Sequence, residues 1–173
     1  ELPEIFNLVH NSNKEVELIL VGKDSADIKT GSTSTWHLMQ PLFNKTALKK
    51  VSYLGAVDYS KIQDLIKDAT VCVFPSFAEA LPVSWLEAMA MEKAIVASNI
   101  GWANEMIEDG KEGFLVHPTA HQQYANSILE LLAEENKRKQ FGEAARRKVK
   151  AKFSHDIVAK QSVEFYKSIL KSR

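Results

Sequence analysis

The sequence has little of what several classes of protein require. Its 173 residues include one cysteine, Cys72, so no disulfide can form within the chain. Its 22 basic and 22 acidic side chains give a formal net charge of zero, which argues against a nucleic-acid partner. No apolar run approaches the roughly 20 residues of a membrane-spanning helix, and no signal peptide opens the chain. We therefore expect a cytoplasmic protein.

Several motifs that hold phosphates or metals are also missing. The seven glycines never form Gly-x-Gly, so neither the dinucleotide fingerprint nor the glycine-rich phosphate loop is present. No Asp-x-Asp occurs that could hold a metal-bound diphosphate. His117 and His121 are four residues apart, but Pro118 disfavours a shared helical face and a third ligand is lacking. We predict no metal site and no cofactor.

What the sequence does contain is an alternation of short apolar runs and amphipathic segments. Each apolar run ends at a residue typical of strand ends, and the segments between the runs carry apolar residues three or four apart. This order predicts an α/β fold with a Rossmann-like parallel sheet, helices on both faces and a helical C-terminal tail from Ala120. The predicted strands are residues 16–21, 51–54, 71–74, 95–97 and 114–116.

The length and the 45% hydrophobic content fit a single domain over residues 1–173. We expect this domain to be truncated at its N-terminus, because Leu2 opens a helix with no strand before it. Ser60 and Ser154 are predicted to cap the helices that follow them. The helix boundaries between residues 31 and 50 stay open, because serines and threonines that could cap a helix precede Pro41.

The most informative stretch runs from Pro75 to Ala90. It follows a predicted strand and opens a helix near Pro82, and ligands of parallel α/β sheets bind at the carboxyl ends of the strands. The free N–H groups of the first helical turn would point out of the sheet, where the helix dipole adds positive potential. The sequence therefore predicts a bound diphosphate at this turn.

Two glutamates bracket that turn, Glu79 in the loop and Glu87 about two turns along the helix. Carboxylates accept hydrogen bonds from pairs of hydroxyls, so they suit a sugar on one side of a diphosphate and a ribose on the other. The same spacing recurs at Glu135 and Glu143, in a polar helical region that we interpret as solvated surface. The residues alone leave a second interpretation equally open. In it, Glu79 interacts only with the dipole at the helix start, and Glu87 is an ordinary glutamate on the helix surface.

A set of short motifs adds to this pattern. Phe-Pro-Ser ends at Ser76, Glu-x7-Glu continues as Glu-Ala-Met-Ala, and Ala-Ile-Val-Ala-Ser ends at Ser98. A later run, Asp-Gly-Lys-Glu-Gly-Phe-Leu-Val, ends at Val116. In this order and spacing the chain resembles the donor-binding domain of retaining glycosyltransferases of the GT-B fold, the group 1 family, also called family 4. The resemblance extends over most of the chain.

The resemblance implies a role for each matching residue. Glu79 would contact hydroxyls of the donor sugar near the reacting centre, as a catalytic residue, and Glu87 would hold the ribose hydroxyls. Backbone groups would meet the phosphate and the base, and a glycine would keep the neighbouring loop close to the ligand. These residues are Gly22, Ala80, Leu81, Pro82 and Val83 for sugar and phosphate, and Gly55 and Val57 for the base.

The implied activity is transfer of a sugar from a nucleotide-diphosphate sugar to an acceptor, with retention of configuration and without a bound metal. We expect it to serve polysaccharide or glycoconjugate biosynthesis. The family's acceptor-binding domain has no match here, so the chain alone is expected to be inactive. Two kinds of alternative stay open: a non-catalytic nucleotide-sugar-binding or interaction module, and a related enzyme that is a sugar-nucleotide epimerase or a phosphorylase. The basic residues between Lys137 and Lys152 are interpreted as solvated surface, with peripheral attachment of the full-length enzyme to the inner face of the membrane as the alternative.

Overall fold

The structure, a computed structural model, describes residues 1–171. All five predicted strands are present and pair in parallel, which confirms the α/β prediction. They form two hydrogen-bonded sheets, one of order β1-β2 and one of order β3-β4-β5. The strands are β1 (Leu18–Leu20), β2 (Val51–Tyr53), β3 (Val71–Phe74), β4 (Ala94–Ser98) and β5 (Phe114–Val116).

Helices connect successive strands. The connection between β1 and β2 contains an irregular loop as well as three short helices. The predicted Ser60 cap is wrong: α4 begins two residues earlier than that cap implies, because Asp58 takes a non-helical backbone and its carbonyl accepts the Lys61 N–H at 2.9 Å. In the open region it is Ser34 that caps a helix, accepting the His37 N–H at 2.8 Å. The helices are α1 (Leu2–Ser12), α2 (Thr35–Met39), the 3-10 helix η1 (Gln40–Leu42), α3 (Lys45–Leu48), α4 (Tyr59–Asp68), α5 (Val83–Ala90), α6 (Ala103–Met106), α7 (His121–Ala133), α8 (Glu135–Lys152) and α9 (His155–Lys171).

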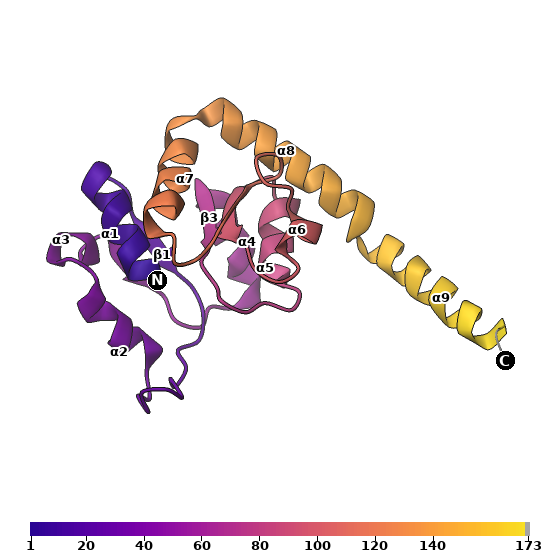
Figure 1. The fold of residues 1–173 in the computed structure, drawn as a ribbon, viewed down its shortest axis with the longest axis horizontal. Helices are drawn as coiled ribbons and strands as arrows, with labels where there is room; N and C mark the ends of the chain where they lie inside the picture. The colour runs from indigo at the N-terminus through magenta and orange to yellow at the C-terminus, as the bar shows by residue number, and fades with distance from the viewer. Residues whose placement is uncertain (172–173) are drawn as a thin grey trace.

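Strand β4 is buried along its whole length and separates two cores. Successive side chains of a strand point to opposite faces. Ala94 and Val96 accordingly pack with residues of α1 and α7, whereas Ile95 and Ala97 pack with residues of α5 and α6. Helices therefore cover both faces of this sheet, as the sequence predicted (Figure 1).

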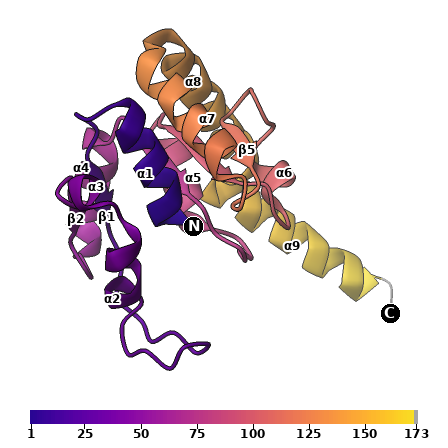
Figure 2. The same cartoon turned by 60° about the vertical axis from the view of Figure 1, so that its left-hand side comes forward.

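A third core lies on the sheet formed by β1 and β2. Its centre combines Phe6 of α1 with Leu18 of β1 and with Phe43 and Ala47. Helix α1 thus contributes Phe6 here and Ile5 to the core of the other sheet. One amphipathic helix therefore packs against both sheets, and Figure 2 shows α1 between the two groups of elements.

The chain ends in two long helices, of which α8 packs on the body of the molecule and α9 extends away from it (Figure 1). Helix α8 is anchored by buried Phe141 and Ala145. Helix α9 has the predicted apolar stripe, but none of its described residues is buried, and Phe165 and Leu170 are largely exposed. None of the helices described in residues 1–171 is long and apolar enough to cross a membrane.

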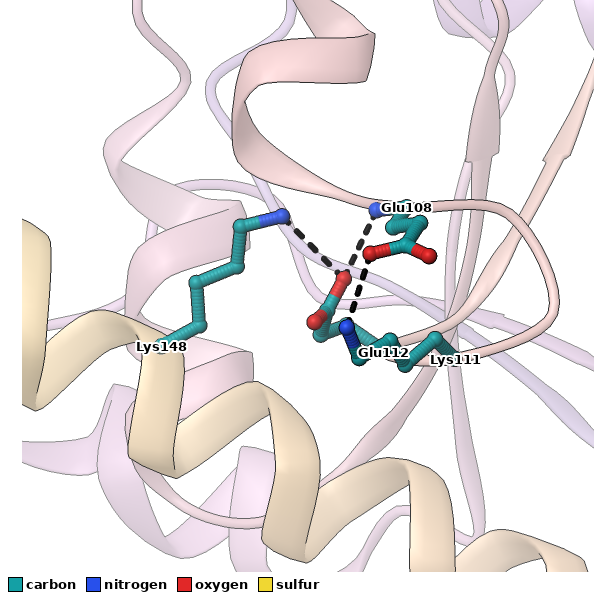
Figure 3. Close-up of polar contacts among 4 residues, drawn as sticks. All are labelled: Glu108, Lys111, Glu112 and Lys148. Atoms are coloured by element: carbon teal, nitrogen blue, oxygen red, sulfur yellow. Dashed lines mark hydrogen bonds and ion pairs between the residues drawn. The ribbon is translucent and has the colours of Figure 1, made fainter.

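The loop between α6 and β5 is held by a buried carboxylate, that of Glu112 (Figure 3). It accepts the backbone N–H of Glu108 at 2.7 Å and contacts the Lys148 ammonium of α8 at 3.1 Å. Gly113 lies so close to β4 that a Cβ there would be 2.5 Å from Cγ2 of Ile95. The Asp-Gly-Lys-Glu-Gly motif therefore fixes the path of this loop and its contact with α8.

Candidate functional site

The start of α5 supplies free backbone donors at the end of β3. Pro82 is buried and precedes the helix, and its carbonyl accepts the N–H groups of Trp85 and Leu86 at 3.0 and 3.4 Å. Within residues 1–171, the N–H groups of Val83 and Ser84 donate to no acceptor. Trp85, only 1% exposed, anchors the first turn to the core. The turn therefore presents two unpaired donors together with the positive end of the helix dipole.

The two glutamates differ in their surroundings. Glu79 lies exposed in the loop before α5 and makes no hydrogen bond or ion pair with any residue that the structure describes. Glu87 is half-buried on α5, and its Oε1 accepts a hydrogen bond from the hydroxyl of Tyr59 at 2.5 Å. This bond, together with the negative charge of Glu87, raises the pKa of Tyr59 above its usual value. Glu87 is thus held in place by the first residue of α4.

The predicted glycines lie together at the ends of β1 and β2. The Gly22 N–H donates to the Gly55 carbonyl at 2.9 Å, and the Tyr53 hydroxyl donates to the Gly22 carbonyl at the same distance. Gly55 has a φ of +66°, which favours glycine. Val57 follows, half-buried, two residues before Tyr59. The hydrogen bond from Tyr59 therefore brings the segment predicted to hold the base to the helix predicted to hold the ribose.

The loop after β4 runs beside Glu79. A Cβ at Gly101 would lie 3.8 Å from the carbonyl oxygen of Glu79. Three loops, which follow β2, β3 and β4, thus meet around α5, where the sequence predicted a ligand. The prediction missed Tyr59, because its contact with Glu87 spans 28 residues and no spacing rule connects the two positions.

Other candidate features of the sequence lie apart from this region. A concavity of about 510 Å³ lies between α6 and α8, and none of the predicted site residues lines it. His117 contacts Thr119, whereas His121 contacts Glu1, so the two histidines have different partners. Burial raises the pKa of the Cys72 thiol to about 11, so the thiol stays neutral at pH 7 and has little nucleophilic character.

Comparisons with known proteins give a consistent result. The sequence model of the family described as glycosyl transferases group 1 matches residues 2–148. Among curated proteins, alpha-maltose-1-phosphate synthase of Mycolicibacterium smegmatis is 35% identical over 115 residues, which are 63% of this chain and 30% of that protein.

Solved structures share the fold over nearly the whole chain. Sucrose-phosphate synthase of Thermosynechococcus elongatus matches with a TM-score of 0.80 at 25% identity, covering 99% of this chain and 43% of that one. Anabaena HepE, solved in complex with UDP-glucose, matches with a TM-score of 0.81 at 24% identity, over 95% of this chain and 44% of its own. The chain thus spans less than half the length of these proteins.

Proposed function

Because the chain belongs to the group 1 glycosyl transferases, we propose that it is the donor-binding part of an enzyme that transfers a sugar from a nucleotide-diphosphate sugar to an acceptor. The observation that carries this proposal is the start of α5, where two unpaired N–H groups stand between an exposed and a half-buried glutamate. A diphosphate with a sugar at one end and a ribose at the other matches this order of donors and acceptors.

The chemistry follows from this placement. When the bond between the sugar and the distal phosphate breaks, negative charge develops on the phosphate oxygen. The N–H groups of Val83 and Ser84 and the helix dipole stabilise that charge and so the leaving group. Backbone N–H groups of Ala80 and Leu81 complete the phosphate site, and Pro82, which has no N–H, sets the extended backbone before the helix. Glu79 accepts hydrogen bonds from hydroxyls of the transferred sugar, and we place retention of configuration within this proposal.

The nucleoside end is proposed to lie across the loop after β2. Glu87 holds the ribose, Gly55 and Val57 meet the base edge through their backbone, and Gly22 keeps the loop after β1 close. UDP-glucose bound to Anabaena HepE, which shares the fold, supports a ligand of this class.

The second substrate is proposed to bind elsewhere in the polypeptide. In support, the chain covers only 43% of sucrose-phosphate synthase, so more than half of that protein has no counterpart here. We propose a cytoplasmic enzyme of polysaccharide or glycoconjugate biosynthesis. The excess of basic residues on α8 supports peripheral association with the anionic inner face of a membrane.

The first test measures binding of UDP, GDP and ADP to the intact protein by calorimetry. At least one of them should bind, and Glu87→Ala should weaken it roughly 10- to 100-fold, because a charge-assisted hydrogen bond contributes about 1.5–3 kcal/mol. Glu79→Ala should leave nucleotide affinity near that of the unaltered protein and lower turnover instead, because its contact is with the sugar near the reacting centre.

Glu135→Ala is the matched control, since Glu135 is an exposed glutamate at the start of α8, away from the proposed site. It should change neither affinity nor turnover. Absence of nucleotide binding would refute the proposed function. Nucleotide binding without any turnover in the unaltered protein would favour the non-catalytic module. Turnover unchanged in Glu79→Ala would return Glu79 to an ordinary role at the helix start.

A further inference from the structure

The hydrogen bond between Tyr59 and Glu87 has no role in the proposed function. The hydroxyl of Tyr59, the first residue of α4, donates to Oε1 of Glu87, in the middle of α5, at 2.5 Å. A phenol that donates to a carboxylate forms a charge-assisted bond, which is shorter and stronger than a neutral one. The bond therefore restrains the orientation of the Glu87 carboxylate.

The contact has little to do with packing. Tyr59 is 67% exposed and belongs to none of the three apolar cores that the structure describes. A side chain this exposed contributes little to the free energy of unfolding through burial. The bond instead fixes the orientation of the Glu87 side chain, which has three rotatable bonds.

We propose that Tyr59 is a positioning residue for the nucleoside: its hydroxyl holds the Glu87 carboxylate in the orientation that receives the ribose hydroxyls. This inference rests on the proposed function of Glu87. It goes further by naming a residue that acts through Glu87 on the affinity for ribose.

The capacity of the carboxylate allows this role. Its two oxygens accept about four hydrogen bonds in all, and Tyr59 occupies one position on Oε1. Oε2 and the second position on Oε1 remain for the two hydroxyls of a ribose. Because the phenol stays protonated at neutral pH, it keeps donating while the nucleotide is bound. Glu87 is then ordered before the ligand arrives, which lowers the entropic cost of binding.

A competing role for Tyr59 predicts the opposite change in nucleotide affinity. If Tyr59 blocks the carboxylate in the empty protein, the bond must break before ribose can bind. Removing the hydroxyl would then tighten nucleotide binding. In the positioning role, the same change weakens binding because Glu87 loses its fixed orientation.

The experiment is calorimetry on the intact protein with Tyr59→Phe, using whichever of UDP, GDP and ADP binds best. The variant keeps the ring and loses only the hydroxyl. We expect the Kd to rise about three- to tenfold, the cost of ordering one long side chain. We also expect the loss of affinity on changing to the 2′-deoxy nucleotide to become smaller, because the weakened contact is the one with the ribose.

Two controls separate positioning from a general structural effect. In a Glu87→Ala background, Tyr59→Phe should have no further effect on the Kd, since the carboxylate through which it acts is gone. Tyr166→Phe, on the distant helix α9, removes a hydroxyl from another exposed tyrosine and should leave the Kd unchanged. Urea unfolding should show that each single tyrosine variant is fully folded under the conditions of the binding measurement.

The outcomes are distinguishable. If the unaltered protein binds a nucleotide but Tyr59→Phe binds it equally well or more tightly, the positioning role is refuted and the proposed function stands. An unchanged 2′-deoxy discrimination would also refute the positioning role. If the unaltered protein binds none of the three nucleotides, the proposed function fails and this inference fails with it.

Discussion

At the scale of single residues, the backbone N–H groups of Val83 and Ser84 limit what the start of α5 can bind. Pro82 lacks an N–H group of its own, and its carbonyl is already engaged by Trp85 and Leu86. In the described part of the chain no carboxylate or hydroxyl caps this helix. Most helices have a Ser, Thr, Asp or Asn at this position to satisfy these donors. The missing cap leaves them available to an external anion.

The donor role of Val83 can be tested by Val83→Pro. Proline is tolerated at the first helical position, and Pro82 already has the extended backbone that a following proline requires. The variant therefore removes one N–H without breaking the helix. Nucleoside diphosphate binding, measured by calorimetry, should weaken about tenfold, because the lost bond is to a charged group.

Val83→Ala is the matched control, because it removes the exposed side chain and keeps the N–H. It should bind nucleotide as the unaltered protein does. Equal affinity in the proline and alanine variants would show that this N–H does not contact the phosphate.

Some residues of the proposed site could be predicted from the sequence, and others could not. Glu79 and Glu87 could be selected because they lie at fixed distances from Pro82 on a segment that begins a helix. The position of Tyr59 beside Glu87 could not, because it depends on how α4 is placed against α5 after folding. The Ser60 cap failed for a related reason: the helix start was decided by the backbone of Asp58.

At the scale of elements, α8 contacts two loops that lie far apart in the sequence. Gly142 sits against the turn after α5, where a Cβ would lie 2.0 Å from the Glu92 carbonyl oxygen. Further along the helix, Lys148 meets the buried Glu112 of the loop before β5 (Figure 3). Side chains of 13% and 5% exposure form this pair, so it is largely shielded from water. Helix α8 thus holds both the end of α5 and the loop that follows α6.

Lys148→Met should destabilise the protein by about 3 kcal/mol. It leaves the Glu112 carboxylate buried with only the Glu108 N–H as a partner, and an uncompensated buried charge costs more than the pair contributes. Urea unfolding at pH 7 measures the change.

Lys150→Met is the control, because Lys150 is exposed on the same helix and forms no ion pair within residues 1–171. It should change the free energy of unfolding by no more than about 0.5 kcal/mol. A similar loss in both variants would mean that methionine itself, and not the broken pair, is responsible.

At the scale of the whole molecule, the zero net charge conceals an uneven distribution of acidic and basic residues along the chain. Residues 1–134 contain ten Lys and Arg against eighteen Asp and Glu, whereas residues 135–171 contain eleven against four. The basic residues of the second part lie on α8, which packs against α5, α7 and β4, and on α9, which extends beyond them (Figure 1). The 17 residues of α9 extend on the order of 25 Å, more than twice the Debye length of about 10 Å at 0.1 M salt. A charged surface that approaches the end of the molecule formed by α8 and α9 therefore meets a local excess of positive charge.

The chain should accordingly bind a cation-exchange resin at pH 7.2, near its isoelectric point, and be released by added salt. The triple variant Lys139→Gln, Lys150→Gln and Lys152→Gln should elute at lower salt. These three lysines form no ion pair among the residues that the structure describes.

A second triple variant, Lys23→Gln, Lys29→Gln and Lys61→Gln, changes the net charge equally but lies in the acidic body. It should elute close to the unaltered chain. Identical elution of the two triple variants would indicate that net charge alone governs binding.

The sequence by itself predicted the five strands and their order, whereas the helices between β1 and β2 stayed open. The short apolar runs of the strands and the three- to four-residue spacing of the helices are local consequences of side-chain size and polarity, so they can be predicted from the sequence. Tertiary structure alone decided which surfaces stay open and which groups meet: the exposed stripe of α9, the buried Glu112 and Lys148 pair, and the bond between Tyr59 and Glu87. Such contacts join residues tens of positions apart, and they depend on how whole elements pack rather than on any neighbour along the chain.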